Sequence, residues 1–338
     1  MPLRLSDLGL WTLDLGLLLF SCSPSMGPTS STDARDRVLV SGSIREDTVW
    51  ERGKDYVVVG DVTVEQGATL TIQPDVRVLF KADTEDDYHG LIVRGKLIAD
   101  GAPPSDSVSR PWTLDLGPWT LDSPGIQFAP VHLAAQRDFE LREEPGSWKG
   151  VWFAPSADSS SVVRVVRIEY AQVGVKANRC AVRVEQVEVV HSKDVGILFN
   201  GSSWGEVLGC TVRENGTGLR FELVKGGEIR GCVVEDNRDK GIECKTSSPE
   251  IKDNLIQGNG WGMYCSYGAS PAIRWNTLVD QKTGAMGQFR DCFSEITGNL
   301  IVQHTGDGIV IGQAGYAGYS APRIGGNNLV SMSDGYAV

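Results

Sequence analysis

A glycine followed by an apolar residue recurs along the second half of the chain at nearly constant spacing. The pairs return after roughly 22 residues. Apolar and polar positions alternate after each glycine, as at Ile197 and Phe199, and this period of two predicts a β-strand. The pairs are Gly174-Val175, Gly196-Ile197, Gly218-Leu219, Gly241-Ile242, Gly262-Met263, Gly284-Ala285, Gly308-Ile309 and Gly335-Tyr336.

A second marker keeps step with the first. An apolar residue stands three positions before a cysteine or an asparagine, again at intervals of roughly 22 residues. Two markers that stay in phase over several turns indicate one structural unit repeated. The second marker occupies Val207–Cys210, Ile229–Cys232, Ile251–Asn254, Ile273–Asn276 and Ile296–Asn299.

The repeated unit is predicted to be one coil of a parallel β-helix. Few good helix formers lie between the markers, and Gly, Asn and Asp crowd the joints, where they permit corners with positive φ. A leucine-rich repeat has a similar period, but it requires a leucine-dense strand and a helical or 3₁₀ return segment. Coils stacked about 4.8 Å apart place equivalent residues above one another. The expected ladders are Cys210, Cys232, Asn254, Asn276 and Asn299, and Asn215, Asn237, Asn259 and Gln281.

The first half of the chain resembles a known family. The segments 56–64, 67–74, 76–80, 90–99, 125–128 and 147–153 are similar to coils of right-handed parallel β-helix proteins of the pectate-lyase-like superfamily at the bacterial cell surface. Asp75 stands where that pattern has glycine, a change that a turn tolerates. The resemblance covers residues 47–338 and implies an all-β, right-handed parallel β-helix with coils of about 22 residues. It does not imply one activity, because such coils serve lyases, hydrolases, epimerases and adhesins.

The chain start resembles a bacterial lipoprotein signal over residues 1–22. Leu19–Cys22 would be the lipobox and Cys22 the lipidated residue, although Phe20 is bulky for that position. A misassigned start is the alternative. Residues 23–46 are predicted to be a flexible linker, residues 47–338 the β-helix, and residues 100–146 an irregular insertion that carries short Trp-Thr-Leu-Asp copies. We expect the protein to be exported, either as a lipoprotein of the outer membrane or cell surface or as a secreted protein.

Composition narrows the partners. The 338 residues carry a net charge of −11, and no basic stripe offsets it, so nucleic acid is not an expected partner. Membrane contact is expected only through a lipid anchor on Cys22. The four histidines lie far from the cysteines in the sequence, so no metal site is predicted. No cofactor is expected, and calcium enters only if the protein is a lyase.

Cysteines and carboxylates offer limited chemistry. Cys244 with Cys265, and Cys210 with Cys232, are expected to face inward on adjacent coils, either as disulfides or as small apolar thiols. Arg220, Glu222 and Glu243 are the catalytic candidates, since two nearby carboxylates can cleave glycosides. Stacking also places Arg220 beside Glu243 and Glu222 beside Lys245, which favours surface ion pairs instead.

Four tyrosines are the remaining candidates. Tyr264 and Tyr267 end one strand, and Tyr316 and Tyr319 occupy a long loop two coils later, so their rings could form a platform for sugars. Glycine-rich loop tyrosines that merely cover a coil edge are the alternative. We interpret the sequence as an exported β-helix surface protein that binds or scaffolds polysaccharide or another cell-envelope component. The alternative is a polysaccharide lyase or glycoside hydrolase that acts on the β-helix face.

Overall fold

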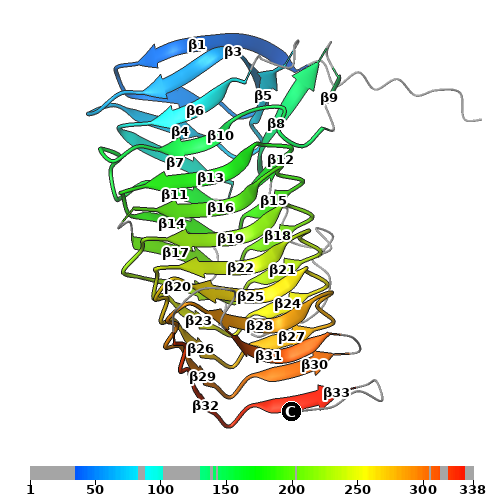
Figure 1. The fold of residues 1–338 in the computed structure, drawn as a ribbon. Helices are drawn as coiled ribbons and strands as arrows, with labels where there is room; N and C mark the ends of the chain where they lie inside the picture. Colours follow the sequence, from blue (N-terminus) through cyan, green and yellow to red (C-terminus); the bar gives the residue numbers. More distant parts are fainter. Residues whose placement is uncertain are drawn as a thin grey trace, which may run out of the picture. The chain divides into compact units, whose positions relative to one another are not determined.

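A computed structural model describes residues 35–82, 88–101, 130–137, 140–141, 144–201, 204–303, 306–312 and 319–331. Every named secondary-structure element within these ranges is a β-strand. Strands of successive turns pair in parallel, about ten turns stack, and the turns repeat about every 23 residues. Within the unit that begins at Arg35, the colours of Figure 1 run in sequence from one end of the stack to the other. The parallel β-helix predicted from the sequence is confirmed.

Each regular turn contributes one strand to each of three sheets. Sheet 1 holds the strands that carry the repeated glycine: β6 (Gly90–Val93), β10 (Gly150–Phe153), β13 (Val173–Asn178), β16 (Val195–Asn200), β19 (Thr217–Glu222), β22 (Lys240–Lys245), β25 (Trp261–Ser266), β28 (Gly284–Phe289) and β31 (Asp307–Gly312). Sheet 2 holds the preceding strands of the turns: β5 (Arg77–Lys81), β8 (Val131–Arg137), β12 (Val166–Glu169), β15 (Glu188–Val190), β18 (Thr211–Arg213), β21 (Val233–Glu235), β24 (Leu255–Gln257), β27 (Thr277–Val279), β30 (Leu300–Gln303) and β33 (Asn328–Ser331).

Sheet 3 begins each turn and has 11 strands in the described part of the chain. These are β2 (Thr48–Trp50), β4 (Thr69–Ile72), β7 (Lys96–Asp100), β11 (Val162–Arg164), β14 (Val182–Glu185), β17 (Trp204–Leu208), β20 (Gly226–Arg230), β23 (Glu250–Lys252), β26 (Ala272–Arg274), β29 (Glu295–Thr297) and β32 (Arg323–Gly325). At the first turns, β1 (Asp36–Ile44) and β3 (Lys54–Val64) run through both sheet 2 and sheet 1, and β9 (Glu140–Leu141) pairs antiparallel with β8.

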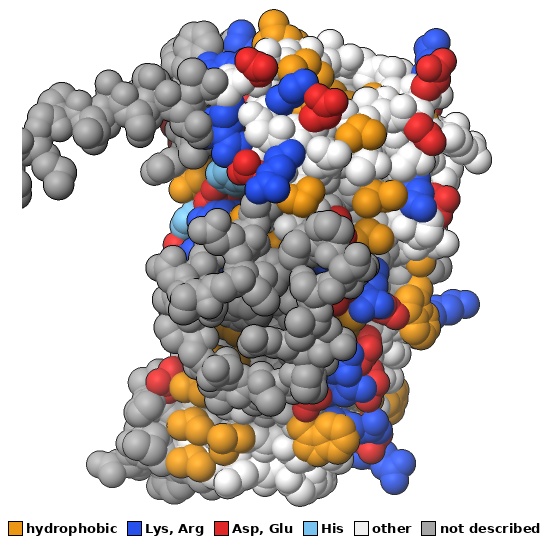
Figure 2. Space-filling model, turned by 180° about the vertical axis from the view of Figure 1, so that it is seen from behind, with side chains coloured by type: hydrophobic (Ala, Val, Ile, Leu, Met, Phe, Trp, Pro, Cys, Tyr) orange, Lys and Arg blue, Asp and Glu red, His pale blue; other side chains and the backbone are white. Residues whose placement is uncertain are grey.

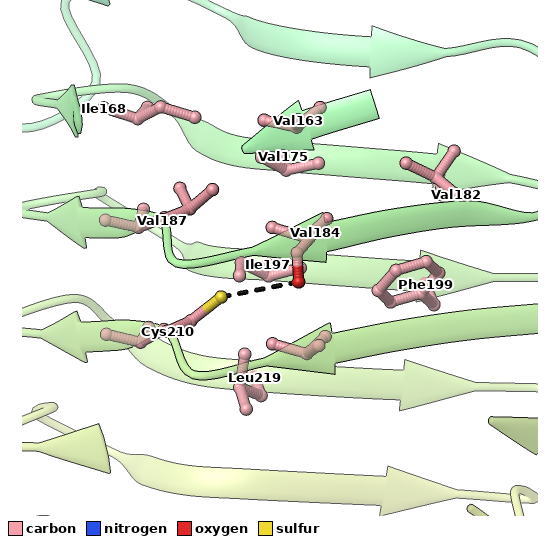
Figure 3. Close-up of a cluster of buried hydrophobic side chains, with 14 of the residues drawn as sticks. Val163, Ile168, Val175, Val182, Val184, Val187, Ile197, Phe199, Cys210 and Leu219 are labelled. Carbon is pink, nitrogen blue, oxygen red and sulfur yellow. Dashed lines mark hydrogen bonds between the residues drawn. The ribbon is translucent and has the colours of Figure 1, made fainter. Parts of the chain in front are cut away.

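The core fills the inside of the coils with stacked apolar side chains. Ile197, Leu219 and Ile242 pair in register on successive strands of sheet 1, and each is fully buried. Beside them, the Phe199 and Phe221 rings lie 5.0 Å apart. Figure 3 shows valines and isoleucines from all three sheets converging on this interior. Burying a side chain of this size contributes about 1.5–3 kcal/mol, so each added turn extends a continuous core.

The corners between sheets are held by left-handed backbone and by buried amides. Asp236 adopts a φ of 52°, and the next residue, Asn237, points inward and is fully buried. Asn237 accepts hydrogen bonds from the backbone N and the Nδ2 of Asn215, at 3.0 and 3.1 Å. It donates to Val212 O and to Asn259 Oδ1. Both predicted amide ladders are confirmed, and the ladder that runs from Cys210 to Asn299 extends to Asn327.

Two predicted boundaries differ from the structure. The predicted linker 23–46 includes β1, whose residues pair with β3, because alternating apolar residues at its start fit the strand pattern of the first coil. The predicted irregular span 100–146 includes β8, which lies between β5 and β12 as an ordinary coil strand. Residues 1–22 with Cys22, residues 23–34 of the predicted linker and the Trp-Thr-Leu-Asp copies lie outside the described residues. None of the described segments is a helix long and apolar enough to span a bilayer.

Candidate functional site

The outward face of sheet 1 brings the catalytic candidates together. Arg220 pairs in register with Glu243, and its Nε contacts Glu243 Oε2. Lys245 Nζ lies 2.7 Å from Glu222 Oε1 on the same two strands. The ion pairing predicted from the stacking is therefore confirmed, and it leaves each of the two carboxylates bound to a cation. Their catalytic role stays a prediction.

Lys240 adds a second cation to Glu243. Its Nζ lies 3.5 Å from Glu243 Oε1, and Glu243 is only 9% exposed to solvent. Both carboxylate oxygens of Glu243 therefore face a cation, Arg220 at Oε2 and Lys240 at Oε1. We call Arg220, Glu222, Lys240, Glu243 and Lys245 the charged rim. Carboxylates paired in this way suit the edge of a binding surface better than they suit acid and base catalysis.

Next to this rim lies a group of three rings, which we call the aromatic cluster: Trp261, Tyr264 and Phe289. The Trp261 ring meets the rings of Tyr264 and Phe289 edge to face, at 5.9 and 5.8 Å. The Tyr264 and Phe289 rings lie 5.1 Å apart. Offset and edge-to-face contacts of this kind stabilise aromatic pairs. All three side chains remain partly exposed, so their surface is available to a ligand.

Glycines make room for the aromatic cluster. A Cβ at Gly284 would lie 2.6 Å from the Trp261 ring, and one at Gly287 would lie 2.5 Å from the Phe289 ring. Neither glycine needs positive φ, so the close approach of the rings is the structural reason for glycine at these two positions. The rings consequently lie down on the sheet.

Lys240 connects the charged rim to the aromatic cluster. Its Nζ lies 5.1 Å from the centre of the Tyr264 ring, within cation–π range. Burial raises the pKa of the Tyr264 phenol, although the nearby Lys240 and Arg290 oppose that effect. The phenol is therefore neutral at physiological pH and can donate a hydrogen bond.

The other predicted tyrosines are placed differently. Tyr267 lies at the next corner, with the Arg290 guanidinium 4.4 Å and the Lys245 Nζ 5.6 Å from its ring centre. Tyr319 is largely exposed, and its backbone N donates to Asp291 Oδ1. Both tyrosines therefore lie near the corner at residues 290–291, while Tyr264 belongs to the aromatic cluster. Tyr316 lies outside the described residues.

Trp261 and Phe289 were missed as candidates from the sequence. The ladder between β25 and β28 pairs Trp261 with Gly284 and then Met263 with Met286, skipping the residue between them. Simple alternation of inward and outward residues therefore predicts that Trp261, the residue before Gly262, faces inward, whereas the skip places it on the outward face. Phe289 could have been found from the sequence, because it shares its column with Lys245 and Ser266, and a polar column indicates the outward face.

A second charged group occupies sheet 2. Glu169 contacts His132 Nε2 and lies 2.7 Å from Arg167, which reaches Glu188 at 2.5 Å. Burial raises the pKa of Glu169, but the hydrogen bonds from His132 and Arg167 outweigh it and lower the pKa to about 2. Figure 2 shows histidine, acidic and basic side chains side by side on the face it views. The mutual pairing indicates a structural role for this group.

Among the described residues, no group of three or more His, Cys, Asp or Glu side chains is arranged to hold a metal ion. The six described cysteines are buried thiols that form no disulfide with one another.

Comparison with known proteins supports the fold. Residues 150–301 match the family described as "Right handed beta helix region". No curated protein matches the chain at a significant level.

Three solved structures are similar to this chain. A mutant of the periplasmic alginate epimerase AlgG is 9% identical over 87% of this chain and 77% of its own, with a TM-score of 0.39. The A-module of the mannuronan C-5 epimerase AlgE6 of Azotobacter vinelandii is 14% identical over 88% of each chain, with a TM-score of 0.31. The enzymatically active domain of tailspike protein 2 of bacteriophage CBA120 is 12% identical over 89% of this chain and 42% of its own, with a TM-score of 0.30.

The likeness to these structures concerns the fold only, and the activities in their names belong to those proteins. The family match over residues 150–301 agrees with the parallel pairing of strands from successive turns. The described residues therefore form a right-handed parallel β-helix, and residues 150–301 match the family model for that fold.

Proposed function

We propose that the protein is an exported polysaccharide-binding protein that makes contact through the aromatic cluster and the charged rim beside it. The observation that carries this proposal is the set of three partly exposed rings lying over Gly284 and Gly287 on the outward face of sheet 1. The ligand class is a polysaccharide or another sugar-containing component of the cell envelope.

The chemistry of sugars supports this choice. A pyranose ring presents C–H groups on its faces and hydroxyl groups around its edge, so a flat aromatic surface with polar groups beside it complements both parts. Trp261 and Tyr264 would supply the apolar surface, as large aromatic side chains do at many binding sites. Lys240 beside them would donate hydrogen bonds to hydroxyl groups or pair with an anionic substituent, and Glu243 would accept hydrogen bonds from hydroxyl groups.

Binding without turnover is favoured over catalysis. Each carboxylate of the candidate catalytic group contacts an in-register cation, and Glu243 contacts two. A glycoside hydrolase needs one protonated and one free carboxyl group at a set separation. Catalysis by a lyase or hydrolase is therefore the alternative, and the binding experiment described below distinguishes the two.

Export belongs to the same proposal. It is supported by the signal-like pattern of residues 1–22, with Cys22 as the expected lipid attachment site. Anchoring at the cell surface or release from the cell would bring the aromatic cluster to polysaccharides outside the cytoplasm.

The test is a binding panel of neutral and acidic polysaccharides, with and without calcium, by affinity electrophoresis and calorimetry. We expect saturable binding that Trp261→Ala weakens about tenfold or more, in line with the loss of about 1–3 kcal/mol per stacked ring. Trp275→Ala is the matched control, because that tryptophan is 61% exposed at a corner of another sheet. Equal loss in both variants would contradict the proposed site.

The same panel distinguishes binding from catalysis. Product formation that is lost in Glu222→Gln or Glu243→Gln would establish the lyase or hydrolase alternative. Saturable binding without product formation, in the wild type and in these two variants, supports the binding protein.

A further inference from the structure

Three buried thiols and one buried amide lie inside the coils that contain β22, β25 and β28. Cys244 on β22 pairs in register with Cys265 on β25, and each is 1% exposed. The next residue of this inward column is Gln288 on β28, where the two strands before β22 carry phenylalanine. Cys292, fully buried at the following corner, contributes the third thiol. A glutamine amide within an apolar column is a costly substitution that calls for an explanation.

The amide of Gln288 is only half satisfied. Its Oε1 accepts a hydrogen bond of 2.6 Å from Ser294 Oγ, and this bond fixes the orientation of the group. Its Nε2 has no hydrogen-bond partner among the described residues, although Gln288 is completely buried. An unpaired buried donor is destabilising, and a negatively charged sulfur on the adjacent strand would be a strong acceptor for it. The nearest in-register neighbour with such an atom is Cys265.

The thiols themselves are unequal. The interaction with Cys265, together with burial, holds the pKa of Cys244 well above its usual value. The hydrogen bond from Cys244 lowers the pKa of Cys265. The proton of the pair therefore stays on Cys244, and Cys265 is the sulfur that develops negative charge.

A second stacked pair provides an internal contrast. Cys210 Sγ donates to Val184 O at 3.5 Å, as seen in Figure 3, and Cys232 Sγ donates to Val207 O at 3.4 Å. Burial, and after it the neighbouring Cys232, raises the pKa of Cys210. Both thiols are engaged with carbonyl groups of the preceding coil, and the residue that follows them in their column is Asn254, whose Oδ1 accepts from Cys232 N. Cys210 therefore favours the protonated thiol.

We propose that Cys244 and Cys265 are a redox-active pair that closes to a disulfide between adjacent coils in the presence of a disulfide oxidant, while Cys210 and Cys232 remain thiols. Neighbouring parallel strands place paired Cα atoms within the range that a disulfide spans. The disulfide ties β22 to β25, the strands that carry Lys240 and Tyr264 on their outward side.

With glutathione disulfide as oxidant, the reaction has two steps. The Cys265 thiolate attacks one sulfur of the oxidant and expels a glutathione thiolate, which leaves a mixed disulfide. Cys244 then loses its proton and attacks the Cys265 sulfur, expelling the second glutathione thiolate. Two protein thiols are oxidised, one glutathione disulfide is reduced to two glutathione molecules, and the released thiolates take up the two protons. Because both sulfurs are buried, the steps require local opening of the coils and are slow.

The experiment equilibrates the full chain with mixtures of reduced and oxidised glutathione, followed by acid quenching, alkylation under denaturing conditions and peptide mapping by mass spectrometry. The expected result is loss of two of the six thiols from Cys180 to Cys292 in a single transition, with the cross-link mapped to Cys244 and Cys265. This measurement uses the wild-type protein, so it does not depend on the folding of any variant.

Variants sharpen the result. Cys244→Ser and Cys265→Ser should each abolish the transition, whereas Cys210→Ser should leave its midpoint unchanged. Gln288→Leu removes the amide donor and should slow cross-linking by about threefold or more at neutral pH, with a smaller difference at high pH where the thiolate forms without help. Retention of all six of these thiols at every ratio, or a Cys210–Cys232 cross-link at the same midpoint, would overturn the proposal.

Discussion

At the scale of single residues, the candidate surface depends on glycines as much as on rings. Gly287→Ala would place a Cβ 2.5 Å from the Phe289 ring and 3.2 Å from the Trp261 ring, so both must move off the sheet. We expect this variant to lose polysaccharide binding to the extent that Trp261→Ala does, and to change the near-ultraviolet circular dichroism of the aromatic residues. Gly325→Ala is the control, because a Cβ there meets nothing within 4 Å. Unchanged binding in Gly287→Ala would separate the rings from the function.

The charge of Glu169 makes a residue-scale prediction about pH. Its pKa of about 2 in the folded protein lies below the ordinary value of 4.5. A carboxylate whose pKa falls on folding adds stability above its unfolded pKa, and this stability is lost as the pH drops from about 5 towards 2. Glu169→Gln should therefore lower the free energy of unfolding at pH 7 by roughly 2 kcal/mol.

The measurement is denaturant unfolding of wild type and Glu169→Gln between pH 7 and pH 3. The difference between the two proteins should shrink as the pH falls. Glu250→Gln, which alters an exposed ion pair on sheet 3, should show a much smaller difference at every pH. A constant difference for Glu169→Gln across this range would contradict the assigned cause.

At the scale of elements, the corner amides connect successive strands. The Asn237 side chain links Asn215 in the coil before it with Asn259 in the coil after it. It makes four hydrogen bonds, one of them to Val212 O. Asn237→Ala leaves buried donors and acceptors unpaired, so we expect it to lower the free energy of unfolding by about 2–4 kcal/mol. Asn200→Ala on the outward face of sheet 1 should cost under about 1 kcal/mol. Denaturant melts compare the two variants, and equal losses would refute a ladder-specific effect.

The elements also mark how far the sequence could be interpreted. The two repeated markers predicted the coil, the inward cysteines and both amide ladders, because stacking repeats the same physical demand in every turn. The outward pattern was less accessible, since the register of sheet 1 skips a residue beside the repeated glycine. Because of this skip, the side chains of Trp261 and Tyr264 lie on the same outward face and their rings are in contact. Phe289 joins them only because Gly287 leaves space, a three-dimensional fact that no spacing rule contains.

At the scale of the folded unit, a right-handed β-helix separates stability from function. Its core repeats along the axis, so single outward side chains can change while the turns persist. The aromatic cluster uses this freedom on two neighbouring strands, β25 and β28. The charged groups of sheets 1, 2 and 3 are mostly paired with each other, which leaves the rings as the distinctive outward chemistry of the described residues.

Hydroxyl-radical footprinting with the best polysaccharide of the binding panel tests the central claim most directly, because aromatic side chains report their own solvent exposure. We predict that saturating polysaccharide lowers the oxidation of Trp261, Tyr264 and Phe289 several-fold. The exposed Trp204 and Trp275 serve as internal references and should be oxidised as in the free protein. Protection of those two references, with the aromatic cluster oxidised as before, would contradict the account.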